Sequence, residues 1–154
     1  MEHKTKVIAE EGKQDLRIFR DFDLPLELLF KAYMIPEIIE QWMETKVLKL
    51  ENKQHGGYCF ETTDPKGNKL RFNGTIHEFV LNKKITRTFE FEQKPFGVQI
   101  EFLEFEELTE NMCRLKIHSI YQSPAHRDEH LKMPFEFGIN IAHNRLQEIV
   151  NKLT

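Results

Sequence analysis

The stretch "RIFRDFDLPLELLFKAYMIPEIIEQWM", residues 17–43, holds a strand pattern followed directly by two short helix patterns. Its beginning, Leu16 to Phe22, alternates and is rich in Phe and Ile, which is typical of a β-strand. Pro25 suits the first position of a helix, and apolar residues recur after it at helical spacing. Pro36 opens the next short segment in the same way. We therefore predict a strand and two short helices in tandem.

Trp42, the single tryptophan of the chain, stands near the end of the second short helix. Its ring can close the mouth of a cavity, or it can cap the core between the helix and a sheet. Sequence leaves both interpretations open. A gate would change its fluorescence when a ligand binds, whereas a core residue would hardly respond.

The middle of the chain changes to a period of two, which indicates strands. The breaks between the alternating segments carry turn residues, as in "DPKGN" at 64–68, where Pro and Gly suit a tight turn. Short turns between successive strands make an antiparallel meander. The six predicted strands are residues 46–51, 57–63, 69–80, 84–92, 98–108 and 113–121.

Helical spacing returns in "FGINIAHNRLQEIVNKL", residues 137–153, whose apolar residues lie along one stripe. We expect this helix to start near Pro134, with a looser turn over residues 123–133 before it. The sheet has to bury this helix, because nothing else in the chain is large enough to cover it. The predicted fold is α+β, a curved antiparallel sheet of about seven strands with two short helices and one long C-terminal helix.

Alternation also predicts which side chains face the long helix. If the turn between the third and fourth predicted strands is centred on Asn82 and Lys83, Glu78 lies opposite Arg87 on the inward face. Such a pair either reaches solvent at the rim of the sheet or serves as a polar anchor for a ligand in a partly hollow interior. The inward apolar set is Phe60, Phe72, Ile76, Phe89, Phe91 and Phe102.

Composition excludes several classes of protein. The chain has 154 residues, a net charge of −3 and a mean hydropathy of −0.54. This charge gives no electrostatic support for nucleic-acid binding, and no apolar run is long enough to span a membrane. Residues 1–14 read as a polar leader and 15–154 as one domain, and without a signal-peptide pattern the expected location is the cytoplasm.

Chemistry-bearing motifs are sparse. The seven histidines show no metal-binding spacing, no nucleophile–base arrangement is evident, and the glycines form no phosphate-binding loop. We therefore predict no metal, no cofactor and no catalytic residue. Cys59 and Cys113 are far apart and are best interpreted as small buried hydrophobes. An enzyme would have to rely on Glu78 as its one candidate carboxylate.

Five segments in order resemble the START-related, birch-pollen-allergen-like superfamily (SRPBCC), and within it the branch named after the C-terminal domain of the heat shock protein 90 ATPase activator. These segments are residues 17–43, 55–68, 72–79, 84–92 and 138–150. The resemblance implies a helix-grip fold, in which the sheet wraps around the C-terminal helix and often encloses a cavity for apolar ligands. Members of the superfamily include lipid carriers, cyclases and co-chaperones.

Three functions are compatible with these observations. The first is binding of a small apolar or amphipathic molecule between the sheet and the C-terminal helix. The second is a co-chaperone-like regulator of the heat shock protein 90 ATPase, and the third is a cyclase or hydrolase that uses the cavity. We expect a monomer or a homodimer, since this fold has exposed sheet edges. The predicted cavity residues are Phe30, Tyr33, Trp42, Phe60, Phe72, Ile76, Glu78, Arg87, Phe89, Phe91, Phe102, Ile117, Phe135, Ile139 and Ala142.

Overall fold

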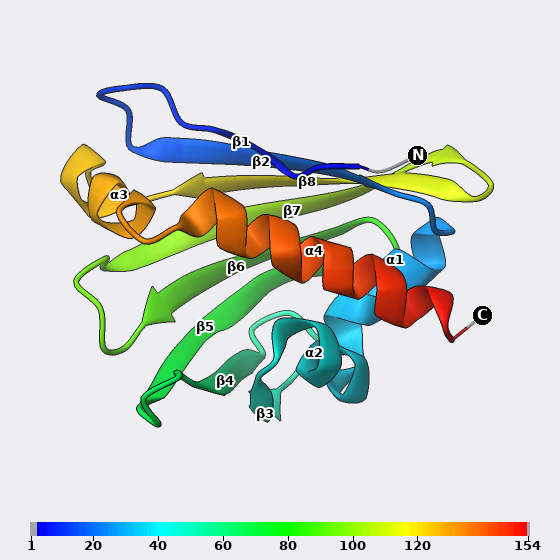
Figure 1. Ribbon diagram of the computed structural model, residues 1–154, viewed down its shortest axis with the longest axis horizontal. Helices are drawn as coiled ribbons and strands as arrows, with labels where there is room; N and C mark the ends of the chain where they lie inside the picture. Colours follow the sequence, from blue (N-terminus) through cyan, green and yellow to red (C-terminus); the bar gives the residue numbers. More distant parts are fainter. Residues whose placement is uncertain (1–2, 154) are drawn as a thin grey trace.

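The computed structural model describes residues 3–153, which form one antiparallel sheet and four helices (Figure 1). The order of strands across the sheet is β1-β2-β8-β7-β6-β5-β4-β3. The strands are β1 (Lys6–Ile8), β2 (Asp15–Phe22), β3 (Lys46–Leu50), β4 (Gly57–Thr63), β5 (Lys69–Val80), β6 (Lys84–Phe91), β7 (Val98–Thr109) and β8 (Met112–Ile120). The helices are α1 (Leu26–Met34), α2 (Pro36–Met43), α3 (Pro124–Leu131) and α4 (Phe135–Asn151).

Helix α4 runs diagonally across the concave face of the curved sheet, with α1 and α2 near its C-terminal end and α3 leading into its start (Figure 1). This arrangement confirms the predicted α+β helix-grip fold. The strand β2 closes the meander because it pairs with β8, the last strand of the chain. The core lies between the helices and the inward face of the sheet, where Phe22, Leu29, Leu115 and Leu146 are fully buried.

The helices begin and end where local chemistry requires it. Pro36 occupies the first turn of α2, and Glu44 ends this helix in the left-handed conformation with a φ of 51°. Ser123 caps α3 by accepting a hydrogen bond from the backbone N–H of His126, and Pro124 follows at the first helical position. These two residues explain why residues 123–133, predicted as a looser turn, contain a helix.

The sheet has eight strands where about seven were predicted. The additional strand, β1, lies within residues 1–14, which were expected to be a polar leader, and it pairs with β2 through Val7 and Ile18. Its three residues are too few to give an alternation signal. None of the helices described in residues 3–153 is long and apolar enough to cross a membrane.

Candidate functional site

The concave face of β6 carries three large side chains that α4 does not fully cover. Ile85, at the start of the strand, is buried, whereas Arg87, Phe89 and Phe91 on the same face are only partly buried. Alternation predicted this face of β6 correctly. These three inward-facing side chains therefore keep part of their surface in contact with solvent.

Arg87 forms an ion pair with Glu101 of β7 on this concave face. The guanidinium Nε donates to Oε1 of Glu101 over 3.0 Å, and the two side chains are 13% and 14% exposed. The guanidinium carbon also lies 5.0 Å from the ring centroid of Tyr58, a cation–π contact. Burial disfavours the charge on Arg87, but Tyr58 and Glu101 offset this, and the pKa of Arg87 lies above its ordinary value.

The ion pair leaves hydrogen-bonding capacity unused. A guanidinium has five N–H donors. Of those on Arg87, only the Nε–H has a hydrogen-bond partner within residues 3–153. The other two guanidinium nitrogens are not fully buried, because no nitrogen of Arg87 is among the fully buried side-chain atoms that lack a hydrogen bond in this range. Arg87 and Glu101 can therefore offer donors and acceptors to a bound molecule.

An aromatic cluster continues from the ion pair toward α3. The rings of Phe72 and Phe89 stack at 5.1 Å, and Phe91 contacts both of them edge-on. Farther along, Phe96 stacks on His130 at 4.6 Å. Burial lowers the pKa of His130 to about 4, so this imidazole is neutral near pH 7. This aromatic cluster is thus apolar and uncharged.

Helix α4 carries three partly buried apolar residues that pack against the core: Phe135, Ile139 and Ala142. Its closest backbone approaches within the described chain are to α2, α1 and β1. The partly buried apolar side chains of β6 and α4 pack against the same hydrophobic core.

The remaining predicted cavity residues belong to the packed core. Trp42 is 4% exposed, its indole N–H donates to the backbone oxygen of Ala32 over 2.7 Å, and its ring contacts Tyr33. These contacts favour the core-cap interpretation of the tryptophan. Six other predicted residues are also buried in this core: Phe30, Tyr33, Phe60, Phe72, Ile76 and Ile117.

Glu78 does not face Arg87, and that prediction was wrong. A β-bulge between Ile76 and Glu78 shifts the register, so that Arg87 pairs with Ile76 and Glu78 pairs with Thr86. Glu78 is exposed and accepts hydrogen bonds from Lys84 and Thr86 at 2.8 and 2.7 Å, and the bond from Lys84 lowers its pKa. The enzyme alternative built on Glu78 loses its inward carboxylate.

Phe102 was also placed on the wrong face. It is 37% exposed and lies on the outer face of β7, whereas Leu103 and Phe105 are buried. Both faces of this strand carry apolar residues, so alternation alone could not assign them. The inward carboxylate that sequence reasoning missed, Glu101, lies on the face shared with Leu103.

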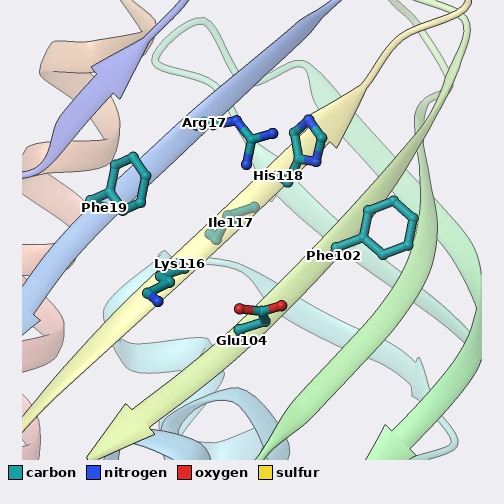
Figure 2. Close-up of a pocket in the computed structure, with 7 residues that line it drawn as sticks. All are labelled: Arg17, Phe19, Phe102, Glu104, Lys116, Ile117 and His118. Atoms are coloured by element: carbon teal, nitrogen blue, oxygen red, sulfur yellow. The ribbon is translucent and has the colours of Figure 1, made fainter. Parts of the chain in front are cut away.

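The outer face of the sheet contains a hollow of about 280 Å³ over β2, β8 and β7 (Figure 2). Two aromatic rings, Phe19 and Phe102, stand on opposite sides of it. The other side chains that line this outer hollow are polar or charged: Arg17, Glu104, Lys116 and His118. Ile117 also borders it, although its side chain is buried in the core.

No group of three or more potential metal ligands occurs within residues 3–153. His126 and His130, four apart in sequence, each have a nearby partner. Nδ1 of His126 lies 2.7 Å from the Ser123 hydroxyl, and Nδ1 of His130 lies 2.5 Å from that of Tyr121. Both cysteines are free thiols, and burial raises the pKa of Cys113 to about 12.

A family model, "Activator of Hsp90 ATPase homolog 1-like protein", matches residues 23–151. This match spans most of the chain. The chain belongs to this family. A comparison with curated proteins finds no match. The family match agrees with the resemblance seen in the sequence and with the helix-grip architecture.

Solved structures share the fold at low sequence identity. A solution structure of a protein from Arthrobacter aurescens has a TM-score of 0.85 and 19% identity, covering 96% of this chain and 91% of that one. Protein Ms6760 from Mycobacterium smegmatis has a TM-score of 0.84 and 18% identity, covering 94% of each chain. A protein from Staphylococcus epidermidis has a TM-score of 0.78 and 19% identity, with 94% of each chain covered. At these identities, the similarities show the fold of this chain alone.

Proposed function

We propose that the chain binds a small amphipathic molecule between α4 and the concave face of the sheet. The observation that carries this proposal is the Arg87–Glu101 pair, which faces inward and still reaches solvent. Desolvating two charges is costly, so two apolar residues at these positions would stabilise the core as well as the ion pair does. A polar anchor in an apolar interior is the arrangement that orients a small ligand.

The surrounding residues define the class of ligand. Phe89 and Phe91 from the sheet, and Ile139 and Ala142 from the helix, offer apolar surface for a hydrocarbon or ring system. The anchor has no net charge, since Arg87 is matched by Glu101. We infer that the preferred head group is an uncharged one that both donates and accepts hydrogen bonds, such as a hydroxyl or an amide.

Titration with the neutral apolar dye Nile red, followed by its fluorescence, tests this proposal. The wild-type protein should bind the dye in a saturable manner, and Ala142→Trp should abolish binding because the larger side chain fills the space beside β6. Ala125→Trp, on the exposed surface of α3, is the matched control and should bind like the wild type. Absence of binding to the wild type, or equal binding to Ala142→Trp, would rule the proposal out.

Regulation of the heat shock protein 90 ATPase is the second candidate function, and the family match favours it. It requires a protein-binding surface, and the site between α4 and the sheet is not needed for it. ATP hydrolysis by the purified chaperone should then rise when the chain is added, and Ala142→Trp should be as active as the wild type. An unchanged ATPase rate, with no complex in a pull-down, would contradict this candidate.

A further inference from the structure

Four of the side chains that line the outer hollow stand at the corners of a parallelogram: Arg17, Phe19, Phe102 and Glu104. Strand register places Arg17, His118 and Phe102 in one row, and Phe19, Lys116 and Glu104 in the next. Arg17 and Glu104 therefore occupy one diagonal, and the two phenylalanines occupy the other (Figure 2). The corners are about 10 Å apart across the strands and about 7 Å apart along them.

The charges in the middle of this surface are already neutralised within the chain. Lys116 pairs with Glu106 at 2.8 Å, and Nε2 of His118 lies 2.7 Å from a carboxylate oxygen of Asp15. The side chains of Arg17 and Glu104 form no ion pair or hydrogen bond within residues 3–153. One unpaired positive charge and one unpaired negative charge thus remain, at opposite corners.

Apolar residues extend the surface beyond the hollow. Val98, Ile100 and Phe102 alternate along the outer face of β7 and are 38%, 43% and 37% exposed. Contiguous apolar side chains on an otherwise charged sheet face are typical of a protein–protein interface. The combination of an apolar centre with unpaired charges at its edge matches the usual layout of such interfaces.

We propose that this outer face packs against the same face of a second copy of the chain. The twofold axis lies in the interface, crosses the diagonal from Arg17 to Glu104 at right angles at its midpoint, and passes close to Phe19 and Phe102. Rotation about this axis exchanges the two charged corners, so Arg17 meets the partner's Glu104 and Glu104 meets the partner's Arg17. Each unpaired charge thereby gains an opposite charge, as a self-complementary interface requires.

The aromatic residues fit the same axis. Because they lie close to it, Phe19 packs near the partner's Phe19, and Phe102 packs near the partner's Phe102, which gives the interface an apolar centre. This axis is inclined to the strands by about 35°, and the two sheets therefore cross at a large angle of about 70°. Orthogonal packing of this kind is one of the two common ways in which sheets stack face to face.

Sedimentation velocity over a concentration series tests the proposal, with charge-reversal variants. The wild type should form a dimer as its concentration rises. R17E and E104R should each sediment as a monomer, because each places like charges opposite one another. The double variant R17E/E104R should recover the dimer, since both signs are exchanged. E148R, which reverses a charge on the exposed side of α4, should behave like the wild type.

An equimolar mixture of R17E and E104R gives the sharpest result. One copy then carries two negative corners and the other two positive corners, so the mixture should dimerise although neither variant does so alone. Circular dichroism of each variant confirms that it is folded. A wild-type monomer at every concentration overturns the proposal. So does a dimer that R17E and E104R leave intact, which would indicate association through the sheet edges or another surface.

Discussion

Arg87 of β6 and Glu101 of β7 face each other on the concave side of the sheet, with Nε and Oε1 3.0 Å apart. Both side chains are largely removed from water, so neither charge is stable without the other. The ring of Tyr58 lies against Arg87, and the amide of Gln99 donates to Oε2 of Glu101 over 3.5 Å. The pair is therefore the charged centre of the candidate site.

A double-mutant cycle over this pair measures how strongly the two residues are coupled. Arg87→Met and Glu101→Leu should each lower the free energy of unfolding by about 3 kcal/mol, because each leaves an unpaired charge in the interior. The double variant should be about as stable as the wild type, since no charge is then left buried. Urea unfolding checks this, and additive losses in the double variant would contradict it.

Gly74 of β5 tests the packing of the strands. A Cβ at this position would lie 2.0 Å from the backbone oxygen of Thr88 and 2.7 Å from Cε1 of Tyr58. Gly74→Ala should therefore force β5 and β6 apart and cost more than about 2 kcal/mol of unfolding free energy. Gly138→Ala, where a Cβ meets open space on α4, should instead stabilise the protein by about 0.5–1 kcal/mol. Equal effects of the two changes in urea unfolding would argue against this strand packing.

Two buried histidines predict a pH dependence of stability. Burial lowers the pKa of His130 to about 4, and burial together with the charge of Arg20 lowers that of His143 to about 3. Both folded-state values lie below the unfolded value of 6.5, so the unfolded chain binds more protons as the pH falls. Their contribution is therefore full above pH 6.5 and is lost as the pH falls toward 4, by about 1.4 kcal/mol per pH unit for each histidine.

Urea unfolding between pH 7 and pH 5 checks this slope. His143→Gln should reduce the slope by about half, because one of the two histidines no longer titrates on unfolding. His77→Gln, at an exposed position, should leave the slope unchanged. A slope that is the same in all three proteins would show that His143 does not contribute.

Trp42 predicts a fluorescence response that separates a core residue from a gate. It is almost fully buried, its N–H is bonded to Ala32, and its backbone oxygen accepts from Arg145 over 2.7 Å. Its emission should be blue-shifted and poorly quenched by acrylamide, and a bound ligand that does not absorb at the emission wavelength should leave it unchanged. Strong quenching, or a shift on ligand binding, would identify a gate instead.

The arrangement of elements followed from sequence because each element has a strong local signal. Proline at the start of short helices and alternation in long strands place the elements correctly, and their order matches the helix-grip fold. The signal for α3 was present in Ser123 and Pro124, a cap followed by a proline. Strand β1 was missed because three residues cannot establish a period.

The candidate site was harder to predict because it depends on register. The single extra residue at the bulge, His77, moved Glu78 to the surface and turned Phe79 toward Phe30, whose ring lies 5.5 Å away. A bulge leaves no mark in an alternating pattern. Phe102 was misplaced because β7 is apolar on both faces, and only its pairing with β6 shows that Glu101 faces Arg87.

Nuclear magnetic resonance of the labelled protein during titration with Nile red tests the central claim most directly. If the ligand binds between α4 and the sheet, the backbone amide signals of Arg87, Phe89, Glu101 and Ala142 should shift as the dye saturates. Those of Arg17 and Phe102 on the outer face should stay in place. Shifts confined to the outer face, or none at saturating dye, would contradict the account.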